Sequence, residues 1–267
     1  ERDLLDGMDH AERAALDRAR VFFEKRSRVP GRAAEQLARL QADVAGHGVE
    51  RADVVIEAIY ENAEAKRELY ARLEPRLKSG ALLATNTSSL MLEPLAEQLA
   101  VPGRLVGLHF FNPVAQMPLV EVVESAATEP QARAAALAFT RAIDKLPLPC
   151  RSAPGFLVNR VLMPYMTEAM LAAGAGVPLA TIDEVAVKFG MPMGPIELAD
   201  IVGLDVCLHV GRILSAACGG PAPDAVAPLV AAGKLGRKTG QGLYEWRDGK
   251  AVKPPVGPAA LAPDDLE

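Results

Sequence analysis

Between residues 53 and 151, short apolar runs alternate with amphipathic segments, and this alternation constrains the fold more than any other feature of the sequence. Residues 53–60 form a nearly continuous apolar run of strand length, which suits a parallel strand covered on both faces. Residues 64–78 have the spacing of an amphipathic helix that ends at Ser79-Gly80. The alternation predicts a doubly wound, Rossmann-type α/β domain with a parallel sheet.

The remaining elements of this domain follow from the same patterns. We expect helices at residues 10–27, 31–42, 90–99 and 129–145. Further strands are expected at residues 81–85, 105–108, 118–123 and 146–150, with a turn at residues 86–89. Together these elements predict a first domain over residues 1–151.

The pattern changes at Pro154-Gly155, after which segments of helical length are separated by Gly and Pro. We expect helices at residues 156–173, 181–189, 194–217 and 224–232, and a Gly-rich basic turn at 236–242 that enters a short strand. These segments predict a smaller, all-α second domain over residues 152–247. Residues 248–267 have the Pro-rich composition of a linker or tail.

Composition excludes several classes of function. The 267 residues carry a net charge of −5, which argues against a nucleic-acid surface, and no apolar run approaches membrane-spanning length. Cys150, Cys207 and Cys218 are odd in number and lack metal-ligand spacing, so we expect reduced thiols in a cytoplasmic protein and no metal site. The chain starts at Glu1 without Met or a signal peptide, and we expect it to be part of a longer protein.

The strongest candidate for chemistry is the segment from Leu108 to Val123. His109 ends one predicted strand, Asn112-Pro113 breaks the chain into a turn, and Glu121 lies inside the next apolar strand. A carboxylate that accepts a proton from one ring nitrogen fixes the tautomer and leaves the other nitrogen free as a base. Two residues make a weak motif, so a core histidine beside an edge-strand glutamate explains this segment equally well.

Polar residues also follow the other predicted strands. The first strand is followed by Glu61-Asn62 with Lys66 in the next helix, and the second by Asn86 through Ser89. Ligands of open α/β sheets bind beyond the carboxyl ends of the strands, so these residues predict a ligand site there. Taken singly, Ser88 also fits a helix N-cap and Asn86 a turn former.

At this point the sequence resembles the 3-hydroxyacyl-CoA dehydrogenase family of fatty-acid β-oxidation. The resemblance covers nearly the whole chain. Within the family, the sequence looks most like the multifunctional enzymes in which this dehydrogenase is fused to an enoyl-CoA hydratase. It rests on six motifs in the family's order, at residues 58–62, 86–90, 107–113, 154–160, 192–195 and 236–242.

The resemblance implies NAD-dependent oxidation of an (S)-3-hydroxyacyl-CoA to the 3-oxoacyl-CoA. It implies that His109 is the general base, that Glu121 orients its imidazole, and that Ser88 hydrogen-bonds the substrate oxygen. It further implies that Asn159 helps to hold the acyl-CoA. The residues that match the family's NAD contacts are Glu61, Lys66, Ser88, Asn112 and Lys238.

Purely structural roles also explain several of these residues. Asn159 also fits a helix cap, Lys66 a solvated helix face, and Lys238 an ordinary loop. The basic first helix favours CoA, whose phosphates need cations, although a solvated helix face explains it almost as well.

The chain departs from the family pattern near its start. No Gly-x-Gly-x-x-Gly occurs before residue 53, so the first strand, the phosphate-binding loop and the first helix of a Rossmann domain are missing. We therefore expect this chain alone to bind NAD poorly. The alternatives are a stand-alone relative that acts on a hydroxy acid or on 3-hydroxybutyryl-CoA, and a non-catalytic assembly module. As partners we expect acyl-CoA and either a second copy or fused β-oxidation modules.

Overall fold

A computed structural model describes residues 10–220 and 223–255, with side chains from residue 14 onward. The chain groups into two compact units, one of residues 1–53 with 75–79 and one of residues 54–74 with 80–267. The predicted first domain, residues 1–151, is therefore shared between two units.

The first unit is helical and small. It contains α1 (His10–Arg26), α2 (Arg32–Leu37) and the 3₁₀ turn η1 (His47–Arg51). Arg76 donates to the carbonyl of Gly46 over 2.6 Å, which attaches residues 75–79 to this unit. None of its described side chains between residues 14 and 53 is fully buried. The described side chains of these helices therefore form no buried core. The helix expected at residues 31–42 ends early, at Leu37.

A five-stranded sheet in the order β1-β2-β3-β4-β5 forms the centre of the second unit. Its strands are β1 (Val54–Glu57), β2 (Leu82–Thr85), β3 (Leu105–Phe110), β4 (Leu119–Glu124) and β5 (Leu146–Arg151). Three pairs are parallel, which confirms the predicted fold class, but β3 and β4 are antiparallel. The connection over residues 111–118 is too short for the crossover that a parallel pair requires.

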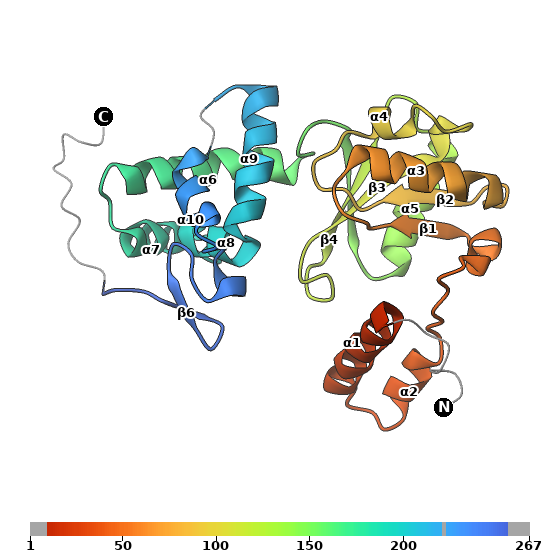
Figure 1. Ribbon diagram of the computed structural model, residues 1–267, viewed down its shortest axis with the longest axis horizontal. Helices are drawn as coiled ribbons and strands as arrows, with labels where there is room; N and C mark the ends of the chain where they lie inside the picture. The colour runs from red at the N-terminus through yellow and green to blue at the C-terminus, as the bar shows by residue number, and fades with distance from the viewer. Residues whose placement is uncertain (1–9, 221–222, 256–267) are drawn as a thin grey trace. The chain divides into compact units, whose positions relative to one another are not determined.

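Helices cover both faces of this sheet (Figure 1). On one face, Leu82, Val106 and Leu108 pack against Ala136 of α5 (Pro130–Ala142). On the other face lie α3 (Ala63–Leu73) and α4 (Leu92–Ala96). Gly107 faces α4, and a Cβ there would lie 2.7 Å from Cβ of Val123, so only glycine permits this approach. The central strands β2, β3 and β4 thus form a largely buried layer, and the edge strands β1 and β5 are partly exposed.

The second half of this unit is mainly helical. Its helices are α6 (Val158–Gly174), α7 (Leu179–Phe189), α8 (Pro195–Val202), α9 (Leu204–Cys218) and α10 (Ala227–Ala231). The single helix expected at residues 194–217 is wrong, because the chain bends by 102° between α8 and α9. Gly203 makes the corner with φ 106° and ψ 126°, a conformation that other residues rarely adopt.

No single helix in the described ranges is long and apolar enough to cross a membrane. The pair α8 and α9 passes such a test only when the two helices are joined end to end across their bend.

The second half is helical, as the sequence predicts, and it ends in a two-stranded hairpin. Strand β6 (Glu245–Arg247) pairs antiparallel with β7 (Lys250–Val252). The residues expected to begin a linker at 248 therefore include a paired strand. The short 3₁₀ segments of this unit are η3 (Pro102–Arg104), η4 (Asp224–Val226) and η5 (Arg237–Thr239), and η2 (Glu74–Arg76) runs from Glu74 of this unit into residues 75–79 of the first.

Two buried aspartates attach this terminal segment to the helices. Asp200 of α8 accepts hydrogen bonds from the Leu243 and Tyr244 amides, 2.8 Å each, and from the Trp246 indole, 2.9 Å. Asp183 of α7 accepts from the Tyr244 hydroxyl at 3.0 Å and forms an ion pair of 2.9 Å with Lys253. Both carboxylates are 1% exposed, so their charges depend on these later residues.

Candidate active site

His109 and Glu121 meet because of the antiparallel pairing of β3 and β4. The two residues are direct Cα partners in the register. Their side chains point to the same face, and Nδ1 of His109 lies 2.7 Å from Oε2 of Glu121. The glutamate side chain is completely buried, and the imidazole is nearly so. The contact thus combines an imidazole with a carboxylate that has almost no access to water.

A tight turn between β5 and α6 fixes the other oxygen of Glu121. Gly155 has φ 70° and Phe156 has φ 51°, so a non-glycine residue occupies the left-handed region here. The turn directs the amides of Leu157 and Val158 at Oε1 of Glu121, 2.8 Å each. With Oε1 occupied in this way, Oε2 is the acceptor for the proton on Nδ1 of His109, and Nε2 is left as the free base.

Two aromatic rings hold the imidazole in place. The His109 ring lies 4.5 Å from that of Phe111 and 5.7 Å from that of Phe156, measured between centroids. Phe156 itself packs with Leu92 and Val123 on the α4 face of the sheet. The turn that supplies the two amides to Glu121 therefore also supplies one wall of the imidazole site.

Glu61 organises the turn that carries Ser88. Its Oε1 accepts from the Thr87 hydroxyl at 2.6 Å, from the Ser88 amide at 2.9 Å and from the Ser89 amide at 3.0 Å. Burial alone would raise the pKa of Glu61, but these hydrogen bonds and the charge of Lys66 outweigh it, so the pKa lies below its ordinary value. Glu61 is thus an anion whose main contact is residues 87–89.

A second carboxylate, Glu57, is linked to Glu61 through Lys66. The sequence did not predict Glu57 as part of the site. Its Oε1 accepts from Lys66 over 2.7 Å, and its Oε2 accepts from Tyr70 and from Thr85, 2.8 Å each. Lys66 also lies 3.6 Å from Glu61 and is only 1% exposed. Lys66 therefore joins the two carboxylates. A glutamate inside the apolar run at residues 53–60 is the sequence signal that would have found this network.

The other predicted site residues lie in different settings. Asn86 accepts from the Phe110 amide at 3.0 Å, and Asn159 donates to the carbonyl of Ser88 at 3.2 Å. Asn112 is exposed and precedes a cis proline. Lys238 pairs with Asp205 at 2.5 Å. The structure thus groups Glu61, Lys66 and Ser88 with Asn159, and His109 with Glu121.

The fold and this arrangement define a class of protein. A doubly wound sheet with polar groups at the carboxyl ends of β1, β2 and β3, and a buried histidine–glutamate pair beside them, is the framework of a nucleotide-dependent oxidoreductase.

Two family models match the chain. The 3-hydroxyacyl-CoA dehydrogenase NAD binding domain matches residues 4–153, and the 3-hydroxyacyl-CoA dehydrogenase C-terminal domain matches residues 155–246. The chain therefore belongs to the 3-hydroxyacyl-CoA dehydrogenase family. This membership confirms the predicted family, the Rossmann-type fold class, the dehydrogenase class and NAD as the cofactor.

Individual relatives show the same likeness. The fatty acid oxidation complex subunit alpha of Ectopseudomonas oleovorans is 38% identical over 235 residues, which are 86% of this chain and 33% of that protein. The structure of a 3-hydroxybutyryl-CoA dehydrogenase from Escherichia coli matches with a TM-score of 0.84 and 35% sequence identity. The match covers 97% of this chain and 57% of the Escherichia coli chain. The (S)-3-hydroxybutyryl-CoA dehydrogenase of Ralstonia eutropha has a TM-score of 0.78 and 34% identity, covering 88% of this chain and 84% of its own. The chain spans about a third of the length of the curated relatives that it matches.

Proposed function

We propose that this chain oxidises the 3-hydroxyl of an (S)-3-hydroxyacyl-CoA to the 3-oxo group, with NAD as the oxidant, as part of a larger protein of fatty-acid β-oxidation. The observation that carries the proposal is the 2.7 Å contact between the His109 imidazole and the buried Glu121 carboxylate. The relatives named fatty acid oxidation complex subunit alpha support the pathway, and the matched family models support the reaction.

The chain's own residues supply a base and orientation. His109 takes the hydroxyl proton at Nε2, while Glu121 at Nδ1 stabilises the imidazolium that results. Ser88 is partly exposed, and its Oγ donates to Oε1 of Glu61 over 3.3 Å, so it would exchange this contact for the substrate oxygen. Asn159, already within hydrogen-bond distance of the Ser88 carbonyl, positions the thioester side of the substrate. When bound, NAD would supply the acceptor for the hydride from C3.

The residues present fit the nicotinamide end of the cofactor. Glu61 and Lys66 follow β1, and Ser88 follows β2, which places them at the edge where dinucleotides bind. Together with Asn112 and Lys238 they are the residues that we propose to contact NAD. Lys238 would share its ammonium group between the cofactor and Asp205. The printed sequence has no Gly-rich loop before residue 53 to hold the diphosphate, and this supports weak binding by the chain alone.

The direct test compares wild type with His109→Gln and Glu121→Gln. Each substitution should lower kcat for a 3-hydroxyacyl-CoA by at least the roughly 10²-fold typical of a lost general base. The dissociation constant for the 3-oxoacyl-CoA should change little, because neither group carries the binding. A glutamine at position 121 accepts from His109 or from the two amides but not from both, so it should cost activity despite its similar size. Near-full turnover in His109→Gln would contradict the assignment.

Two alternatives remain. The likeness to proteins named 3-hydroxybutyryl-CoA dehydrogenase favours a short-chain substrate, which a comparison of kcat/KM for C4 and longer thioesters would decide. The second alternative is a non-catalytic assembly module. In that case the chain would bind acyl-CoA but would produce no NADH at any concentration of NAD.

We further infer a homodimer or an association with other β-oxidation modules, in the cytoplasm. Val185 and Phe189 are 61% and 88% exposed, and they stand four residues apart on one face of α7. An exposed apolar pair of this kind supports a contact with another protein surface. The free thiols of Cys150, Cys207 and Cys218 support a reducing compartment.

A further inference from the structure

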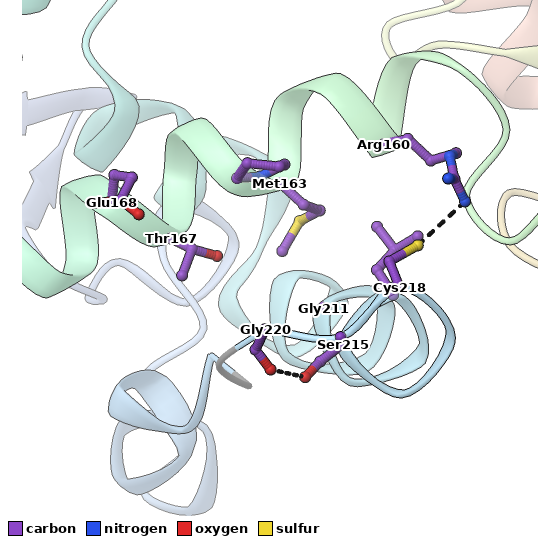
Figure 2. Close-up of a pocket in the computed structure, with 11 residues that line it drawn as sticks. Arg160, Met163, Thr167, Glu168, Gly211, Ser215, Cys218 and Gly220 are labelled. Carbon is purple, nitrogen blue, oxygen red and sulfur yellow. Dashed lines mark hydrogen bonds between the residues drawn. The ribbon is translucent and has the colours of Figure 1, made fainter.

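A cavity of about 240 Å³ lies between α6 and α9 and has no role in the reaction described above. On α6 its lining recurs at the spacing of one helix face and consists of Arg160, Met163, Pro164, Thr167 and Glu168. On α9 it is lined by Gly211, Leu214, Ser215 and Cys218. Figure 2 shows Arg160, Met163 and Thr167 reaching from α6 toward this helix.

The wall of the cavity suits an apolar guest. Met163, Pro164 and Leu214 are among the residues that line it. Of the polar residues in the lining, Arg160 donates to Sγ of Cys218 over 3.1 Å, and Ser215 donates to the Gly220 carbonyl over 2.7 Å. These two side chains therefore already have hydrogen-bond partners, and Thr167 and Glu168 complete the polar part of the lining on α6. The volume is below the roughly 300–1,000 Å³ of sites that enclose a drug-sized ligand, so a hydrocarbon chain fits and a nucleotide does not.

Met163 separates this cavity from a smaller one. The second cavity, of about 20 Å³, shares Met163 and Thr167 with the first and is otherwise lined by apolar side chains that include Met166 and Met170. Methionine is unbranched and adapts its shape to its neighbours. A shift of Met163 would join the two cavities, so the available length depends on this side chain.

Gly211 fixes where the tip of Met163 lies. A Cβ at position 211 would be 2.9 Å from Cε of Met163 and 2.3 Å from Cγ of Pro223. Only a glycine therefore allows α9 to approach Met163 this closely.

The lining of the cavity on α6 begins at Arg160, the residue directly after Asn159 of the proposed active site. Asn159, whose amide lies 3.2 Å from the Ser88 carbonyl, stands four residues before Met163 on the same face of the helix. Four residues correspond to about 6 Å along the helix axis, a few methylene lengths. A substrate whose C3 oxygen is at Ser88 and His109 could thus extend its far end along this face.

We propose that this cavity receives the distal part of the acyl chain, and that Met163 and Gly211 set the longest chain that is accepted. The inference rests on the proposed function, because it requires an acyl-CoA substrate. The inference goes beyond the proposed function because it names the residues that determine the length of the acyl chain. The His109–Glu121 pair does not control this property.

The test is calorimetric titration of the 267-residue chain with 3-oxoacyl-CoA of C4 and of C10, which needs no NAD. Met163→Trp fills the cavity, so the C10 thioester should bind at least roughly tenfold more weakly while C4 is unchanged, since each methylene kept from apolar surroundings costs about fourfold. Met163→Ala should shift the preference toward the longer chain. The matched control is Val161→Trp on the same helix, where the side chain is 68% exposed and outside the cavity.

A second measurement covers the case in which the tryptophan variant fails to fold. Cys218 is exposed at the rim, so alkylation with N-ethylmaleimide should weaken C10 binding in the wild type but not in Cys218→Ser. An unchanged C4-to-C10 ratio after both treatments would overturn the chain-length assignment and leave the His109 proposal standing. Failure of the wild type to bind either thioester would overturn both.

Discussion

Glu61 is an anion held mainly by backbone and hydroxyl donors, and this gives its contribution to stability a defined pH dependence. Its pKa lies below the ordinary 4.5, so the ionised form stabilises the fold above that pH. The stabilisation is lost as the pH falls through the folded-state pKa. Glu61→Gln should therefore lower the free energy of unfolding at about pH 7, and the deficit should shrink at about pH 3.

Urea denaturation of wild type and variant at both pH values measures this difference. Glu68→Gln, an exposed substitution on α3, is the control and should show no comparable loss at either pH. A deficit of the same size at both pH values would mean that the Glu61 charge is not what holds residues 87–89.

Tyr70 shows how a hydroxyl supports the buried Glu57. Burial raises the pKa of Tyr70, and the Glu57 charge adds to this, so the hydroxyl stays protonated and donates. Tyr70→Phe should lower the free energy of unfolding by roughly 1.5–3 kcal/mol, the range for a hydrogen bond to a charged group. Tyr165→Phe is the matched control, because the buried Tyr165 hydroxyl has no hydrogen-bond partner in the described ranges. Equal losses in the two variants would contradict this role.

The sequence indicates His109 and Glu121 because both stand out against apolar strands, and a turn after Asn112 brings the strands together. It does not reveal which residues complete the environment of each charge. The amides that reach Glu121 come from residues 157 and 158, and those that reach Asp200 come from residues 243 and 244. Such contacts depend on tertiary packing, which no local pattern encodes.

The corner between α8 and α9 depends on a single residue. A Cβ on Gly203 would lie 2.9 Å from both Oδ1 of Asp205 and Nζ of Lys238, and its φ of 106° strains any other residue. Gly203→Ala should lower the free energy of unfolding by about 1–3 kcal/mol.

The control is another glycine with the opposite expectation. Gly174 closes α6, and a Cβ there would meet nothing within 4 Å. Gly174→Ala should be neutral or raise the free energy of unfolding by up to about 1 kcal/mol. Denaturant midpoints of the two variants should therefore move in different directions, and a harmless Gly203→Ala would show that the corner tolerates a side chain.

Gly203 also explains why one element was predicted wrongly. Residues 194–217 keep a helical apolar pattern throughout, and a single glycine within such a pattern does not predict a bend of 102°. The hairpin partner β7 was missed because three residues are too few for a periodic signal. The order of strands and helices in residues 53–151 followed from the sequence because each element there is bounded by turn residues.

At the scale of the whole molecule, the exposed face of α7 predicts self-association. Phe189→Lys and Val185→Lys should shift the sedimentation coefficient toward that of a monomer, because a charge replaces apolar contact area. Val101→Lys, in the sheet part and 40% exposed, is the control and should leave association unchanged. A wild type that sediments as a monomer at all concentrations would remove the case for a homodimer.

The two buried aspartates of α7 and α8 also affect the order in which the chain folds during synthesis. Asp183 and Asp200 are synthesised before their partners Tyr244, Trp246 and Lys253. At a translation rate of roughly 5–20 residues per second, the interval is several seconds. During that interval Asp200 lacks its three donors from residues 243–246, and Asp183 has the amides of Ile196 and Glu197 but not Tyr244 or Lys253. A buried charge with incomplete partners resists burial. The helical half therefore closes only when its last strand has been synthesised. A chain stopped after residue 240 should leave α7 open to proteases.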